Sequence, residues 1–257
     1  MKIKNIQLIA VMAFGCLIAA GCKSHYQMTS FTGGRYAIDS KYDVNQDRDA
    51  ITIIAPYKRT VDSIMSPIIG HSDHLLTAYR PESELSNLVA DILRNAVSEY
   101  TGKPADVGIM NMGGLRTSLP EGDITFGNIY EITPFENSLC IIKMSGKDLR
   151  SIFSDMAKVH GEGLSGAQLV ISKEGELISA NVSGRNLDDN KTYVIATIDY
   201  IAEGNDHLNT FRKFSDAEKI MPKGTTVRQL FLNYVTATER QGKKVNSKIE
   251  GRIIVKE

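Results

Sequence analysis

The sequence of 257 residues has no tryptophan, only seven prolines and three cysteines, and no excess of either charge. Thirty basic residues balance 30 acidic ones, which argues against a general nucleic-acid binder, because such proteins usually carry a basic surface. Seven prolines against 21 glycines exclude collagen-like and low-complexity chains. Hydrophobic residues make up 42% of the chain, so we expect a globular protein rather than a disordered one.

The first residues have the pattern of a secretion signal. Two lysines precede an apolar stretch, residues 6–20, that is shorter than the roughly 20 residues of a membrane-spanning helix. The stretch ends in Ala19 and Ala20, and Gly21 and Cys22 follow; this ending resembles a bacterial lipobox, in which cleavage precedes a cysteine that is then lipidated. We therefore expect a signal peptide over residues 1–21 and a lipid on Cys22. An uncleaved anchor and a plain secretory signal are the alternatives.

The predicted signal peptide and lipid site determine the expected location, charge and thiol chemistry of the chain. The lipid would be the only membrane contact, and we expect a chain in the cell envelope that faces the periplasm from the outer membrane. Removal of residues 1–21 would leave 28 basic and 30 acidic residues, a net charge of −2. Cys140 would then be the only free thiol, so no intramolecular disulfide is expected. Its apolar neighbours favour a buried, inert thiol over a nucleophile.

Helix and strand patterns follow one another along the rest of the chain. Residues 22–34 have no apolar period and are expected to be a tether. Apolar positions every three or four residues predict helices over 85–100, 148–159 and 226–239, and a weaker one over 51–69. β-Branched runs predict strands over 106–110, 138–144, 167–172, 177–183, 192–198 and 252–256, with a hairpin turn at 173–176. Because the order is irregular, we expect one mixed α/β (α+β) domain of layered helices and sheets over residues 35–257.

A glycine-rich turn with polar residues at both ends follows the first predicted strand. Asn111 begins this turn, Gly113 and Gly114 form its centre, and Arg116 ends it. Paired glycines let a backbone turn sharply and approach a ligand closely. An arginine offers a planar fork for phosphate or carboxylate, and an asparagine offers both a donor and an acceptor. The alternative is an ordinary turn with a solvated arginine.

Three further segments hold candidate binding residues. Phe135 precedes the strand 138–144, and its ring is either exposed for stacking or buried in the hydrophobic core. Tyr200 and Asp206 follow the strand 192–198, and such a pair can stack a base and accept hydrogen bonds from sugar hydroxyls, unless Asp206 only caps its turn. Arg80 precedes the helix 85–100, whose N-terminus favours anions.

Taken in order, these segments resemble the C-terminal, substrate-binding domain of the periplasmic 5′-nucleotidase / 2′,3′-cyclic phosphodiesterase family. The resemblance covers roughly residues 35–257 and is carried by Arg80 with 86–91, 111–116, 132–139, 163–166 (a Gly/Ser-Gly turn) and 199–206. Tyr200 stands where the family usually has phenylalanine, Asn205 replaces a glycine of its Gly-Gly-Asp, and Ser86 replaces a glycine before the helix. The resemblance implies the fold of that domain.

The resemblance also implies a role for each candidate residue. Two arginines would bind the phosphate of a nucleotide, one asparagine would contact the base, two rings would hold the base between them, and one carboxylate would accept the ribose hydroxyls. In that order, these residues are Arg80 and Arg116, Asn111, Phe135 and Tyr200, and Asp206. Gly113, Gly114, Asn137 and Gly163 belong to the same motifs and complete the predicted substrate-binding set.

The catalytic half of that family has no counterpart in this sequence. None of the five histidines lies in an Asp-x-His or Gly-Asn-His-Asp/Glu motif of a two-metal site, so we predict no catalytic residue, metal or cofactor here. The first hypothesis is the nucleotide-recognition half of a split 5′-nucleotidase, which hydrolyses nucleoside 5′-phosphates with two divalent metals on a separate metallophosphatase chain. The alternatives are a stand-alone nucleotide- or nucleoside-binding lipoprotein, and a scaffold that has lost its ligand and buries Phe135 and Tyr200 in its core.

Overall fold

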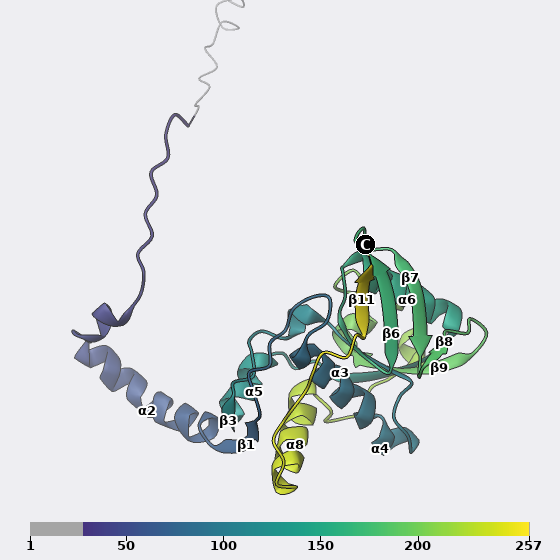
Figure 1. Cartoon of the computed structure of the whole chain (residues 1–257). Helices are drawn as coiled ribbons and strands as arrows, with labels where there is room; N and C mark the ends of the chain where they lie inside the picture. Colours follow the sequence, from purple (N-terminus) through teal and green to yellow (C-terminus); the bar gives the residue numbers. More distant parts are fainter. Residues whose placement is uncertain (1–27, 257) are drawn as a thin grey trace, which may run out of the picture. The chain divides into compact units, whose positions relative to one another are not determined.

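The computed structural model describes residues 28–256 (Figure 1). The predicted signal peptide 1–21, the predicted lipid site Cys22 and the first part of the predicted tether lie outside the described residues. Contacts divide the chain into two units, Met1–Thr52 and Ile53–Glu257. Within the described residues, the first unit holds the short 3-10 helix η1 (Ser40–Asp43) and the start of helix α2 (Arg48–Met65). The domain boundary at residue 35 stays a prediction.

The second unit contains the three strongly predicted helices and several short ones. Their bounds are α3 (Glu84–Ala96), α4 (Ser98–Thr101), α5 (Phe126–Ile132), α6 (Gly146–Lys158), α7 (Asp199–Ala202) and α8 (Val227–Arg240), with the 3-10 helices η2 (Met112–Gly114), η3 (Asn209–Lys213) and η4 (Asp216–Glu218). The helix predicted over 85–100 is interrupted at Val97 and ends at Gly102, whose φ is 76°. The side chains of Ser83, Ser145 and Thr226 cap α3, α6 and α8 by accepting backbone N–H groups.

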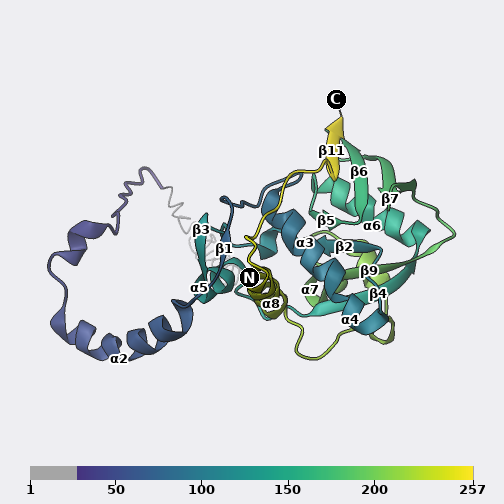
Figure 2. The same cartoon turned by 60° about the horizontal axis from the view of Figure 1, so that its bottom comes forward.

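The described strands form three sheets (Figures 1 and 2). The five-stranded sheet has the order β10 (Lys219–Ile220), β4 (Leu139–Ser145), β9 (Thr192–Ile198), β2 (Val107–Met110), β5 (Gly163–Ser165). The four-stranded sheet has the order β11 (Ile253–Lys256), β6 (Ala167–Ser172), β7 (Leu177–Val182), β8 (Arg185–Asn186), and β1 (Ile68–Ser72) pairs with β3 (Gly122–Thr125). Strands β6 and β7 are antiparallel, which confirms the predicted hairpin at 173–176.

The core lies around the five-stranded sheet. Helix α3 packs on β2, β5 and β9, while α6 packs on β4 and β9 and also on β6 and β7 of the four-stranded sheet. All four residues of β2 are buried, so both faces of the sheet are covered there. A Cβ at Gly108 of β2 would lie 2.4 Å from the carbonyl oxygen of Ala90, so only glycine lets α3 approach this closely.

The mixed α/β fold class is confirmed, but the sequence patterns missed the short elements. Helix α5 and strands β1, β3, β8 and β10 span two to seven residues each, too few to display a hydrophobic period. Residues 163–166 were expected to form a turn. Instead, Gly163–Ser165 form the edge strand β5, because they hydrogen-bond antiparallel to β2.

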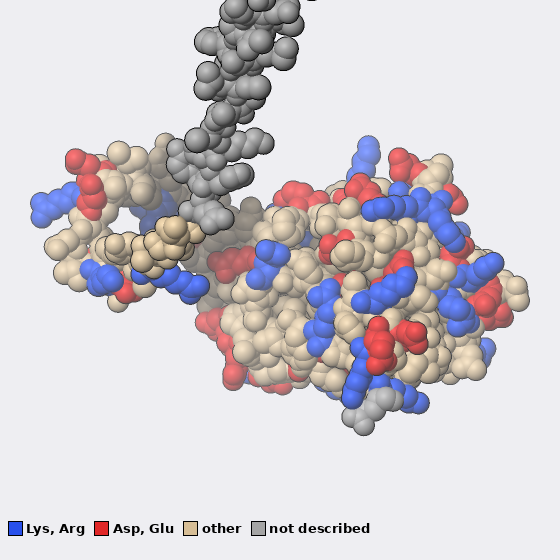
Figure 3. Space-filling view, turned by 90° about the horizontal axis from the view of Figure 1, so that it is seen from above, with Lys and Arg blue, Asp and Glu red and all other residues tan. Residues whose placement is uncertain are grey.

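The surface carries charges of both signs side by side. In the face shown in Figure 3, basic and acidic side chains are interspersed over the described residues. This distribution agrees with the balanced composition and gives no patch of one sign on that face. Among residues 28–256, no helix combines the length and the apolar character that crossing a bilayer requires.

Cys140 is fully buried in β4, and burial raises the pKa of its thiol to about 12. Only the thiolate reacts with alkylating reagents, so a pKa raised from 9.0 to about 12 lowers the reactive fraction roughly 1,000-fold. We expect iodoacetamide at pH 8 to leave Cys140 of a chain starting at Lys23 unmodified, and to modify it in concentrated urea, as followed by mass spectrometry. If Cys140 of the folded protein were alkylated as fast as the thiol of free glutathione, this prediction would be wrong.

Candidate functional site

Three loops that hold candidate residues meet at one edge of the five-stranded sheet. Strand β9 runs parallel to β2, so the carboxyl ends of both strands lie at the same edge. Strand β4 runs antiparallel to β9, with Leu139 opposite Ile198, so its amino end lies at that edge too. The loops after β2, after β9 and before β4 are therefore brought together, although Asn111 and Asp206 are 95 residues apart in sequence.

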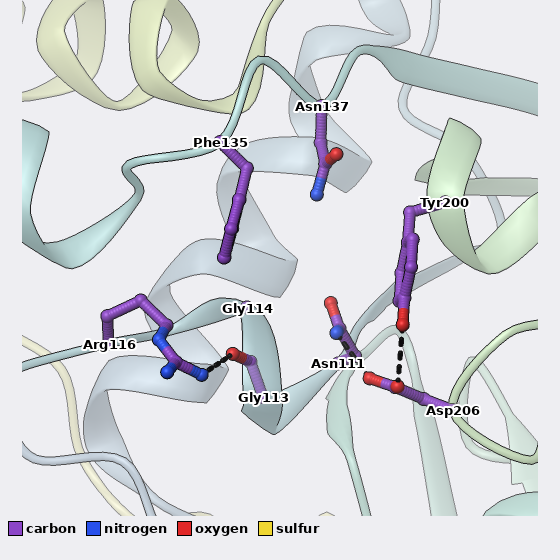
Figure 4. A pocket seen from close by; sticks show the side chains of 8 residues that line it. All are labelled: Asn111, Gly113, Gly114, Arg116, Phe135, Asn137, Tyr200 and Asp206. Carbon is purple, nitrogen blue, oxygen red and sulfur yellow. Dashed lines mark hydrogen bonds between the residues drawn. The ribbon is translucent and has the colours of Figure 1, made fainter.

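These loops enclose a pocket of about 300 Å³ (Figure 4). This volume is at the lower end of what small-ligand sites require. The rings of Phe135 and Tyr200 stand on opposite sides of the pocket, both seen edge-on in Figure 4. Eight of the ten predicted binding residues line it: Asn111, Gly113, Gly114, Arg116, Phe135, Asn137, Tyr200 and Asp206.

A buried carboxylate, that of Glu162, holds the turn after β2 by a hydrogen bond to its backbone. Glu162 is 1% exposed, accepts the backbone N–H of Met112 and forms an ion pair with Arg80. Burial raises the pKa of the Glu162 carboxyl, and the nearby Asp206 raises it further, against the lowering effects of Met112 and Arg80. A Cβ at Gly114 would lie 2.7 Å from the Oδ1 atom of Asn111, so the glycine lets that amide pack against the turn.

Asp206 is held by two side chains at one end of the pocket. The Nδ2 group of Asn111 donates to Oδ2 of Asp206 at 2.5 Å, and the Tyr200 hydroxyl donates to Oδ1 at 3.1 Å. The bond to Asp206 raises the pKa of the Tyr200 phenol, because the carboxylate favours the protonated donor. The Oδ1 atom of Asn111 is buried against Gly114, and no described residue forms a hydrogen bond with it.

Arg116 supplies the positive charge of the pocket. Its backbone N–H donates to the carbonyl of Ile132, and its guanidinium donates to the carbonyl of Gly113 at 3.1 Å. The guanidinium carbon lies 6.0 Å from the centre of the Phe135 ring, at the limit of a cation–π contact. Phe135 is 48% exposed and Tyr200 is 39% exposed, so neither ring is buried in the core, as a scaffold without a ligand would require.

Sequence reasoning missed Arg228, which fixes the loop that carries Phe135. From the first turn of α8, its guanidinium donates to the carbonyl oxygens of Thr133, Pro134 and Phe135 and to the carboxylate of Glu136. The Arg228 side chain is 12% exposed, so these bonds are partly shielded from water. No local signal marks this residue, because its partners lie more than 90 positions earlier in the chain.

Two predicted binding residues do not line the pocket. The guanidinium of Arg80 is engaged by Glu162 and by the carbonyl of Gly161, and Gly163 lies in β5 opposite Met110. Their predicted ligand contacts stay predictions. Within the described part of the chain, no three His, Cys, Asp or Glu side chains are grouped as metal ligands would be.

The pocket thus combines three kinds of group that recognise different parts of one ligand. Two facing rings can hold a flat aromatic group, Asp206 offers hydrogen-bond acceptors, and Arg116 offers a fork of donors with a positive charge. Arg116 and Asp206 balance in formal charge, so any anion must be attracted locally by Arg116.

Comparison with known proteins agrees with this geometry. The sequence model described as "5′-nucleotidase, C-terminal domain" matches residues 68–213. The chain is 30% identical over 200 residues to the NAD 5′-nucleotidase of Haemophilus influenzae, covering 66% of this chain and 33% of that protein. It is 25% identical over 217 residues to the trifunctional nucleotide phosphoesterase protein YfkN of Bacillus subtilis, covering 77% of this chain and 14% of that protein.

The fold is shared with solved structures. A 5′-nucleotidase precursor from Thermus thermophilus superposes with a TM-score of 0.69 at 24% identity, over 80% of this chain and 43% of that one. The chain therefore spans less than half the length of each of these three proteins. Because the family model covers more than half of the sequence, including all eight residues that line the pocket, the chain belongs to the 5′-nucleotidase C-terminal domain family.

Proposed function

We propose that this chain is the nucleotide-recognition half of a split 5′-nucleotidase. The observation that carries the proposal is the pocket in which Phe135 and Tyr200 face each other, with Asp206 at one end and Arg116 as its cation. A nucleotide presents the matching groups in one molecule: a flat base, sugar hydroxyls and a phosphate. The names of the relatives, an NAD 5′-nucleotidase and a nucleotide phosphoesterase, support the same class of ligand.

In this proposal each side chain has a defined task. The base lies between the two rings, where stacking contributes about 1–3 kcal/mol per base by analogy with single-strand binders. Asp206, oriented by Asn111 and Tyr200, accepts the sugar hydroxyls. Asn111, which lines the pocket, contacts the base. Arg116 holds the phosphate in a fixed position relative to the base.

The bond-breaking chemistry is proposed to reside on a separate metallophosphatase chain, whose two divalent metals would activate water and stabilise the phosphate charge. This chain contributes position: it holds the phosphate ester in one place so that the second chain attacks a bound substrate. Envelope location with a lipid on Cys22 is part of the same proposal.

Removal of one ring should weaken nucleotide binding strongly. We expect Phe135→Ala to lower the affinity for AMP about 5- to 150-fold, which corresponds to the loss of about 1–3 kcal/mol of stacking. Isothermal titration calorimetry checks this, with Tyr100→Ala as the control because Tyr100 is a similarly exposed ring outside the pocket. Equal affinity of the Phe135→Ala and Tyr100→Ala variants would show that the base does not bind between the rings.

Arg116 should matter for phosphate but not for folding. We expect Arg116→Ala to weaken AMP binding about 10- to 100-fold, the value of a hydrogen bond to a charged group, and to leave adenosine binding nearly unchanged. The melting temperature should stay within a few degrees of the wild type, because Arg116 is exposed. A large loss of thermal stability, or an equal loss for adenosine and AMP, would assign Arg116 a structural role instead.

The split arrangement is tested by activity. We expect the pure chain to release no phosphate from AMP, and to stimulate AMP hydrolysis when a metallophosphatase chain captured with it from its own cell envelope and a divalent metal are present. A phosphate-release assay on each chain alone and on the mixture decides the matter. A captured phosphatase that is equally active without this chain would refute the split enzyme.

The second candidate is a stand-alone nucleotide- or nucleoside-binding lipoprotein. The observation in its favour is that this chain itself supplies both rings, the carboxylate of Asp206 and the guanidinium of Arg116 to one pocket. AMP binding in the calorimeter without any captured phosphatase would favour this function over the split enzyme.

A further inference from the structure

The longest helix of the described chain carries an apolar face that no residue of the range 28–256 covers. Helix α2 spans 18 residues and none of its residues is buried. Five large side chains recur along one side of it, at positions 53, 54, 57, 61 and 64, and all of them belong to the unit Ile53–Glu257. We call Ile53, Ile54, Tyr57, Val61 and Ile64 the α2 patch. Each of its members is between 51% and 72% exposed.

An isolated helix of this kind needs a partner to be stable. Helices in proteins gain most of their stability from packing an amphipathic face, and α2 packs none of its own. Pro56 inside the helix also removes one backbone hydrogen-bond donor. Polar side chains such as Arg59 and Ser63 occupy the opposite side, so the sequence separates one apolar face from one solvated face.

A lipid surface and a second copy of the chain fit the α2 patch poorly. Interfacial helices are rich in lysine and arginine, whereas α2 has three basic and two acidic residues, and Lys58 is paired with Asp62 at 2.5 Å. Two such helices, each about 27 Å long and about 10 Å wide, would cover on the order of 300 Å² on each copy. Stable interfaces need about 800 Å² on each partner. A larger protein that takes the helix into a groove fits better.

The C-terminal end of α2 is joined to the wall of the pocket by one short helix. A Cβ at Gly127, in the first turn of α5, would lie 3.0 Å from the carbonyl oxygen of Met65, the last residue of α2, and the N–H of Phe126 donates to the carbonyl of Pro67. The seven residues of α5 then lead directly to the loop with Phe135. The C-terminal end of α2 therefore lies about 10 Å of helix from that loop.

We propose that the α2 patch is the docking surface for the separate metallophosphatase chain. This inference rests on the proposed function, which requires a second globular protein at this chain. The occupant is expected to present an apolar groove that accepts Tyr57 at its centre, because the patch offers isoleucine, valine and tyrosine and almost no net charge. The patch shares no residue with the nucleotide pocket, so docking and nucleotide binding are separable.

Site-specific photocrosslinking in cells that produce the full chain tests the proposal. p-Benzoylphenylalanine replaces Tyr57 in one variant and Arg59, on the opposite side of the helix, in the control. We expect the Tyr57 position to crosslink to a metallophosphatase chain, identified by peptide mass spectrometry, and the Arg59 position to give little of this adduct. A Tyr57 adduct with a second copy of this chain, with lipid alone, or no adduct would overturn the proposal.

Binding of purified proteins provides a second measurement. We expect Ile54→Asp combined with Val61→Asp to weaken association with the captured metallophosphatase at least tenfold, and Ser63→Asp to leave it unchanged. Both variants should bind AMP like the wild type in the calorimeter, which shows that the domain is folded. If the double variant still associates fully, only the docking surface is wrong. If the wild type associates with no metallophosphatase, the proposed function and this inference both fail.

Discussion

The hydrogen-bond register of β9 is the constraint on which the candidate site depends. This strand pairs in parallel with β2 on one side and antiparallel with β4 on the other, so two carboxyl ends and one amino end meet at a single edge of the sheet. A slip by one residue would turn every side chain of β9 to the opposite face and would misplace Tyr200 at its end. The buried character of β9, covered by α3 and α6, opposes such a slip because it would expose apolar side chains. Packing of the core and geometry of the pocket are therefore parts of one arrangement.

Polar groups outside the pocket then set the loops that the sheet edge brings together. Glu162 holds the turn after β2 through the Met112 N–H and is itself neutralised by Arg80. A buried carboxylate without such partners would be costly, which explains why this arginine is engaged by Glu162 and does not line the pocket. Arg228 holds the loop before β4 through three carbonyl oxygens. Both supports join distant parts of the chain, so the two walls that face the ligand are fixed by long-range contacts and not by local turn preference.

This division explains what could be predicted from the sequence. The strong helices and strands follow from hydrophobic period, and the turn from Asn111 to Arg116 follows from its glycines, because both signals are local. The family resemblance added Phe135 and Asp206 as members of one site, and the pocket contains both. The ion pair between Arg80 and Glu162 could not be predicted, because the two residues are 82 positions apart and no local sequence pattern indicates their contact. Short edge strands such as β5 exist only through their pairing and have no pattern of their own.

The proposed two-chain arrangement places different demands on the two surfaces of this domain. In this proposal, the rings and Asp206 would contact the bound substrate and its transition state equally, so they would raise affinity and fix orientation without lowering the barrier of the chemical step. The acceleration must then come from groups that reach the phosphate from the other chain. Such a partner has to stay near the pocket while nucleotides enter and products leave, which a contact made through the pocket itself would obstruct. The apolar face of α2 is separate from the pocket, and the end of this helix lies beside α5. A partner bound there could stay attached while the two rings remain accessible to the ligand.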